Sequence, residues 1–101
     1  IMEQTLCPHR YPVISATPHI HMRNAYMLNH IAKKYDDVIV LENPRNDRVA
    51  NLDDVIGLML LEAREQDELQ IALYSDPEDE GFLCRAKSIV EDIAQALSIR
   101  F

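Results

Sequence analysis

The apolar residues of this 101-residue chain follow two spacings that alternate along the sequence, and this alternation strongly limits the possible folds. In residues 69–73, leucine and isoleucine occupy every second position, which is typical of a half-buried β-strand. In residues 82–97, apolar side chains recur three or four positions apart, which is typical of one face of an α-helix. The fold must therefore bury one face of a sheet against helices.

Further segments of both kinds complete the pattern. Strands are expected at 11–16, 38–41, 48–51 and 69–73, and helices at 23–35 and 53–64. A third helix is expected to start at Pro77 and to carry the apolar stripe of residues 82–97. The resulting order is β-α-β-β-α-β-α, and a sheet with its helices on one face buries these stripes, so the predicted class is α+β. Residues 1–10 are interpreted as an N-terminal extension or lead-in, and residues 11–101 as one domain.

Composition indicates an ordinary soluble globular protein, with 48% apolar and 27% charged residues. The sequence shows neither a signal peptide nor an apolar run approaching the roughly 18–20 residues of a membrane span, so we expect a cytoplasmic protein without membrane insertion. The net charge of −7 argues against nucleic acid as a partner. Cys7 and Cys84 are interpreted as free thiols, with Cys84 packed in a helix.

The helix ends carry recognisable signals. Asn51 is expected to cap the second helix, and Asp76 followed by Pro77 offers a cap and a first helical residue for the third. Apolar residues cover nearly the whole circumference of the second helix, so we expect some of them to face outward.

His21 and Arg23 lie two residues apart, where the first strand gives way to the first helix. A neutral imidazole is a good nucleophile near pH 7, because its unperturbed pKa is about 6.5. A helix N-terminus favours both the neutral ring and a phosphate dianion, and arginine offers a planar fork of donors to phosphate. This pair therefore suits a histidine that carries a phosphoryl group, which needs no base to activate water.

Two stretches of the sequence resemble HPr, the histidine phosphocarrier of the bacterial sugar phosphotransferase system. Residues 21–25, HMRNA, are similar to the family's active-site stretch of histidine, any residue, arginine, then usually proline and alanine. Residues 51–59, NLDDVIGLM, are similar to a second family stretch, and residues 78–80 give a weaker match. The resemblance extends over roughly residues 11–98.

The resemblance implies an open-faced β-sandwich, in which three helices lie on one face of a four-stranded antiparallel sheet. It implies that His21 accepts a phosphoryl group from an enzyme I-like donor charged by phosphoenolpyruvate, and that Arg23 binds the phosphoryl oxygens. The group then passes to a sugar-specific, EIIA-like or regulatory acceptor, and no cofactor is needed. The implied docking residues are Met22, Val55, Ile56 and Met59.

Four positions depart from the family pattern. His19 stands where the family usually has glycine, and Asn24 where it usually has proline, so we expect a less rigid start of the first helix. Asp54 stands at the regulatory serine, where a carboxylate cannot be phosphorylated but could act as a permanent mimic of phosphoserine. Asp53 replaces a lysine, and the more acidic face could weaken docking of enzyme I or favour a more basic partner.

Two alternatives remain open from the sequence. Asn24 and Asp54 support a regulatory binding domain that has the HPr fold but does not transfer phosphate. A more remote alternative is a small protein that binds zinc or copper. Its ligands would be Cys7, His9, His19 and His21, brought together if the first segment folds back.

Overall fold

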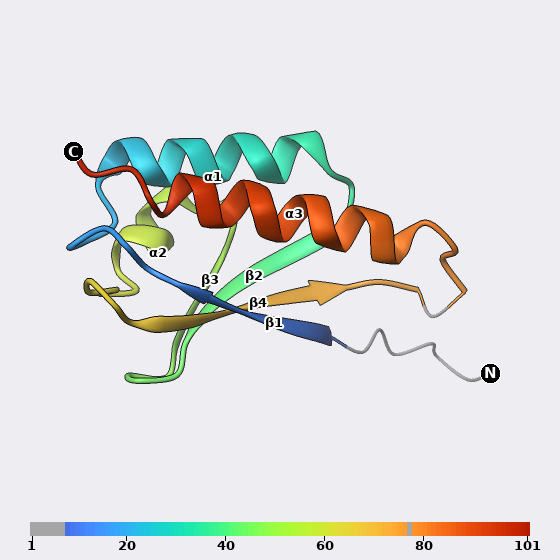
Figure 1. Cartoon of the computed structure of the whole chain (residues 1–101), viewed down its shortest axis with the longest axis horizontal. Coiled ribbons are helices and arrows are strands. Elements are labelled where there is room, and N and C mark those ends of the chain that lie inside the picture. The colour runs from blue at the N-terminus through green and yellow to red at the C-terminus, as the bar shows by residue number, and fades with distance from the viewer. Residues whose placement is uncertain (1–7, 77) are drawn as a thin grey trace.

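The structure, a computed structural model, describes residues 8–76 and 78–101 as one sheet with helices on one face (Figure 1). The strands are β1 (Pro8–Ile14), β2 (Val38–Asn43), β3 (Arg48–Asn51) and β4 (Glu68–Tyr74). The helices are α1 (Met22–Lys34), α2 (Val55–Met59) and α3 (Phe82–Ala96). The order β-α-β-β-α-β-α is as predicted.

The sheet is antiparallel throughout, with strand order β1-β4-β2-β3. Its central strand pairs place Ile71 of β4 between Tyr11 of β1 and Leu41 of β2. Leu69, Ile71 and Leu73 have no exposed surface, because the alternating pattern of β4 turns all three toward the helices. The predicted α+β class and the open-faced sandwich are therefore confirmed.

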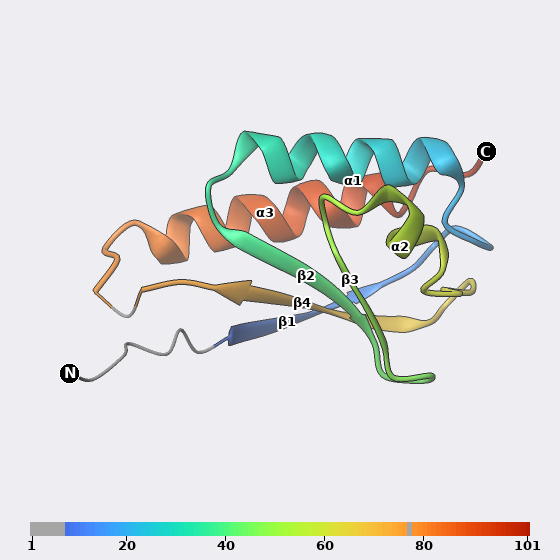
Figure 2. The same cartoon turned by 180° about the vertical axis from the view of Figure 1, so that it is seen from behind.

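The helices form the second layer. α1 and α3 run side by side along the sheet, while α2 lies beneath the first half of α1 (Figures 1 and 2). Side chains from all three helices complete the core, among them Leu28, Leu58 and Ile89, none of which has exposed surface. The end of the chain lies beside the start of α1 (Figure 1). No helix in the described residues combines the length and the apolar character that a membrane crossing requires.

The second helix is shorter than the pattern predicted, covering Val55–Met59 rather than 53–64. The β2–β3 hairpin takes the backbone carbonyls that a longer helix would use. The side chains of Asn43 and Asn46 both donate to the Leu61 carbonyl, at 3.0 and 2.9 Å, and Glu62 then adopts a positive φ of 55°. The cap is Asp54, not Asn51, because the Asp54 carboxylate accepts from the Gly57 N–H.

The ends of two other elements also differ from prediction. β1 starts at Pro8 and stops at Ile14, because the N–H of Ser15 donates to Asp67 outside the sheet. α3 begins at Phe82, with Gly81 as its cap, so Asp76 does not cap it and instead accepts from the Glu78 N–H. Cys84 lies on α3 as expected but is exposed, not packed. Pro77 and Cys7 lie outside the described residues.

Candidate functional site

His21 is the N-cap residue of α1. Its backbone is extended, and its ring Nδ1 accepts a hydrogen bond of 3.1 Å from the N–H of Arg23. In a neutral imidazole this bond assigns the lone pair to Nδ1 and the proton to Nε2. The nucleophilic nitrogen therefore faces the unpaired N–H groups at the positive end of a 13-residue helix, and the ring is partly exposed.

Arg23 lies in the first turn of α1 and is exposed. Within residues 8–76 and 78–101 it forms no ion pair. Its guanidinium instead lies over the ring of Phe101, with 5.6 Å between Cζ and the ring centroid. A guanidinium in this setting keeps its donors available for an anion.

Asn24 fixes the start of α1 by hydrogen bonds. Its Oδ1 accepts from the His21 N–H at 2.9 Å, which completes a capping box with the His21 side chain. Its Nδ2 donates to two carbonyls at and just after the end of α3, that of Ala96 at 2.8 Å and that of Ile99 at 2.9 Å. The side chain has no exposed surface, so these bonds supply the rigidity that a proline would otherwise give.

The segment after α3, residues 98–101, lies against the loop before α1. Arg100 donates to the Ala16 carbonyl at 3.3 Å and forms an ion pair with Glu65. Phe101 follows, and its ring centroid is 5.3 Å from that of His21. Sequence reasoning missed this contact, because nothing in the residues after the helix indicates where they lie.

The four predicted docking residues lie on the first turn of α1 and on α2. Met22 is 50% exposed, Ile56 66% and Met59 37%, while Val55 is half-buried against the core. The expectation that part of α2 faces outward is confirmed, since Leu60 is also exposed. These exposed apolar side chains are the candidate docking residues.

Asp54 lies at the start of α2, with its Oδ1 accepting from the Gly57 N–H at 3.0 Å. A Cβ on Gly57 would come 2.4 Å from the other carboxylate oxygen of Asp54, so only glycine leaves room for this cap. The neighbouring Asp53 is exposed, and its backbone carbonyl accepts from the Asn29 side chain at 2.9 Å. Both carboxylates therefore border the apolar residues of α2.

A different arginine occupies the opposite end of the helical layer. Arg85, near the start of α3, donates from Nε and Nη2 to Asp37, both at 2.9 Å, and also to Asp79. The hydrogen bond from Arg85 is the largest influence on Asp79 and holds the pKa of this carboxyl below its usual value. Sequence reasoning gave this cluster no role, because Asp37 lies 48 positions from Arg85 and no local pattern indicates that the two meet.

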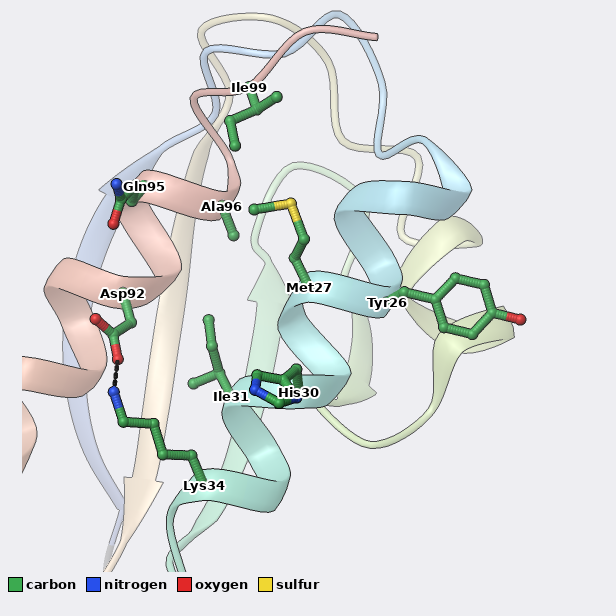
Figure 3. Close-up of a pocket in the computed structure, with 9 residues that line it drawn as sticks. All are labelled: Tyr26, Met27, His30, Ile31, Lys34, Asp92, Gln95, Ala96 and Ile99. Carbon is green, nitrogen blue, oxygen red and sulfur yellow. Dashed lines mark hydrogen bonds and ion pairs between the residues drawn. The ribbon is translucent and has the colours of Figure 1, made fainter.

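A groove of about 690 Å³ runs between α1 and α3, with Met27, Ile31 and Ala96 on its floor (Figure 3). Lys34 and Asp92 form an ion pair of 3.3 Å at one end. Asp92 also accepts from the Tyr35 hydroxyl at 3.0 Å. The pKa of Tyr35 is raised, mainly by burial and secondly by this hydrogen bond. Ile99 lies at the other end of the groove, which connects it to the segment beside His21.

The metal alternative is disfavoured by the position of its residues. His19 and His21 have ring centroids 6.1 Å apart, but the ring of His9 packs on Phe82 at the start of α3. The described residues contain no group of three metal-ligating side chains, and Cys7 lies outside them.

Comparison with known protein families tests the resemblance noted in the sequence. The model for the PTS HPr component phosphorylation site matches residues 11–97. The chain belongs to the HPr family. It is therefore a phosphocarrier-family domain, as the two sequence stretches suggested. The comparison with curated protein sequences gives no match.

Solved structures of HPr proteins share the fold at low sequence identity. HPr-C-His from Thermoanaerobacter tengcongensis is 16% identical with a TM-score of 0.67, and covers 89% of this chain and 94% of its own. The phosphocarrier protein HPr from Bacillus anthracis is 17% identical with a TM-score of 0.65, at 88% and 95% coverage. A histidine-containing phosphocarrier protein from Mycoplasma is 19% identical with a TM-score of 0.65, at 88% and 91% coverage. At these identities the structures support the HPr fold alone.

Proposed function

We propose that this HPr-family protein accepts a phosphoryl group on Nδ1 of His21 and passes it to a second protein. The observation that carries the proposal is the hydrogen bond from the Arg23 N–H to Nδ1, which leaves the lone pair at the N-terminus of α1. The donor is an enzyme I-like protein charged by phosphoenolpyruvate, and the acceptor is EIIA-like or regulatory. The reaction belongs to the cytoplasm, the compartment typical of the family.

The proposed transfer is a single displacement at phosphorus. The Nδ1 lone pair forms the N–P bond while the bond from phosphorus to the donor breaks, and the donor atom leaves with the electron pair. Nε2 keeps its proton during this step, so the ring needs no general base. The second transfer is the same step in reverse, with His21 as the leaving group.

Two features of the site stabilise the phosphoryl group after transfer. The Arg23 N–H loses its acceptor once Nδ1 binds phosphorus, and it can then donate to a phosphoryl oxygen. The Arg23 guanidinium has no carboxylate partner among the described residues, so it can turn to the same oxygens without breaking an ion pair.

The docking surface lies beside this site. Met22 on α1 and Ile56 and Met59 on α2 are exposed, and Val55 supports them from below. We propose that donor and acceptor both bind here, because methionine adapts its shape to more than one partner. Successive use of one surface is consistent with a carrier that must release one protein before it meets the next.

The test is phosphorylation by phosphoenolpyruvate and enzyme I, including the enzyme I of its own source, followed by native mass spectrometry. We expect one added phosphoryl group that is labile in acid and stable in base. His21→Ala should abolish it, while His19→Ala and His30→Ala, which change one exposed histidine before α1 and one within it, should retain it. Absence of the added mass with every enzyme I would refute the carrier proposal.

A regulatory binding domain without phosphoryl transfer is the second candidate. The observation that favours it is Asp54, which places a permanent carboxylate at the start of α2 beside the exposed Ile56. This candidate expects a partner to be recovered equally well by the unmodified chain and by His21→Ala. Under the carrier proposal, His21→Ala removes the phosphorylated form of the protein. Binding of the partner is measured in a separate experiment.

A further inference from the structure

Phe101 touches both members of the candidate phosphoryl site. Its ring centroid lies 5.3 Å from the His21 ring, with 35° between the ring planes, and 5.6 Å from Cζ of Arg23. The first distance is typical of an aromatic pair and the second of a guanidinium over a ring face. One side chain therefore connects the nucleophile to the cation that would hold its phosphate.

The position of Phe101 is set by contacts on both sides of residues 98–101. Asn24 donates to the carbonyls of Ala96 and Ile99, and Arg100 donates to Ala16 and pairs with Glu65. Ile99 fills the end of the groove between α1 and α3, where Figure 3 shows its side chain above Ala96 and Met27. These contacts determine where the ring lies before any ligand arrives.

Asn24 links this arrangement to the start of α1. The same amide that accepts from the His21 N–H donates to the segment that carries Phe101. A proline at this position would have no side-chain donor for either carbonyl. The presence of asparagine at position 24 therefore helps to place Phe101.

We propose that Phe101 is a positioning residue of the phosphoryl site, and that Asn24 holds the segment which presents it. The aromatic ring keeps the Arg23 guanidinium beside the His21 imidazole, so that an incoming phosphate meets both groups at once. This inference rests on the proposed function for its use in phosphoryl transfer. The contact itself and its effect on anion binding stand independently of that function.

The experiment compares Phe101→Leu with Phe101→Tyr, which keeps the aromatic ring. In ¹⁵N- and ¹³C-labelled protein, the His21 ring protons should shift in Phe101→Leu, because the ring current is lost, and stay close to the parent in Phe101→Tyr. Titration with inorganic phosphate should show weaker binding at His21 and Arg23 in Phe101→Leu only. The second-order rate constant for transfer from phosphorylated enzyme I should fall roughly tenfold in Phe101→Leu.

Asn24→Asp tests the anchor separately. It keeps an oxygen to accept from His21 but replaces the two donated hydrogen bonds with a carboxylate facing carbonyls, so the ring protons should shift as in Phe101→Leu. Circular dichroism of each variant shows whether it folds, and Phe101, being 49% exposed, is the safer position.

The outcomes separate the two proposals. Unchanged ring protons and phosphate affinity in Phe101→Leu would overturn the positioning role, even if the parent protein accepts a phosphoryl group. Equal losses in Phe101→Leu and Phe101→Tyr would overturn it as well. If the parent accepts no phosphoryl group but Phe101→Leu still shifts the ring and weakens phosphate binding, the positioning role stands and the carrier function fails.

Discussion

The two ends of the layer formed by α1 and α3 use arginine in opposite ways. At the start of α3, Arg85 gives its donors to Asp37 and Asp79, and Asp37 has a side chain only 9% exposed. At the start of α1, Arg23 has no carboxylate partner among the described residues and rests on an aromatic ring. The satisfied arginine holds the fold together, whereas the unsatisfied one is available to a ligand.

Among the variants that test this contrast, Arg23→Ala should have the largest effect on phosphoryl transfer. Removal of the guanidinium should slow phosphoryl transfer to His21 about 100-fold, because one preorganised donor to the transferred group is lost. The free energy of unfolding should change by less than about 0.5 kcal/mol, since Arg23 is exposed. Stopped-flow transfer assays and urea unfolding measure the two quantities. A fast transfer in the variant would remove Arg23 from the site.

Arg85→Ala should produce the reverse pattern. Loss of the paired hydrogen bonds leaves the buried carboxylate of Asp37 without its partner, and the free energy of unfolding should fall by about 1–2 kcal/mol. Transfer to His21 in the folded protein should stay within about twofold of the parent, because the two ends are independent. Arg85→Lys, which keeps the charge but not the fork, should lie between parent and alanine variant.

If phosphoryl transfer in Arg85→Ala falls only as far as the fraction of folded protein falls, the result still fits this pattern. A larger loss in Arg85→Ala would mean that the two ends are coupled through α1 or α3. That outcome would break the contrast drawn above.

Acid should weaken the Arg85 end. The pKa of Asp79 is held below its usual 3.8, chiefly by the hydrogen bond from Arg85. The group therefore adds stability that is fully present above about pH 5 and is lost as the pH falls through its folded-state pKa. Urea midpoints measured from pH 6 to pH 3 should fall less steeply in Asp79→Asn than in the parent. Equal slopes would show that Asp79 contributes nothing to the acid response.

The sequence predicted the regular part of the fold because each core element carries its own periodicity. The alternation in β4 and the stripe of α3 were sufficient to place Leu69, Ile71 and Ile89 in the core. The length of α2 could not be predicted, since its end depends on hydrogen bonds from Asn43 and Asn46 of the β2–β3 hairpin to the Leu61 carbonyl. Periodicity carries no information about such hydrogen bonds.

The candidate site divides in the same way. His21 and Arg23 stood out because their chemistry and their place before a helix are both local. The capping role of Asn24 was not predicted, because the usual capping box pairs serine or threonine with glutamate or glutamine three residues later, and His21 with Asn24 does not match that pattern. Its bonds to Ala96 and Ile99 and the contact of Phe101 join residues more than 70 positions apart, and no local pattern predicts them.

The smallest expected effect concerns charge on the docking face. Asp53→Asn removes an exposed carboxylate beside α2 while its backbone carbonyl still accepts from Asn29. If the phosphoryl donor is acidic where it docks, transfer should speed up about threefold at low salt, because like charges no longer repel during encounter. The gain should shrink as salt rises, since the Debye length falls from about 10 Å at 0.1 M to about 3 Å at 1 M.

Glu78→Gln supplies the matched control, because it removes an exposed carboxylate near the start of α3, at the Arg85 end. An equal gain in transfer rate in both variants would mean that only the net charge of the protein affects the encounter, wherever the carboxylate lies. A slower Asp53→Asn would indicate a basic partner instead, which the acidic start of α2 would attract.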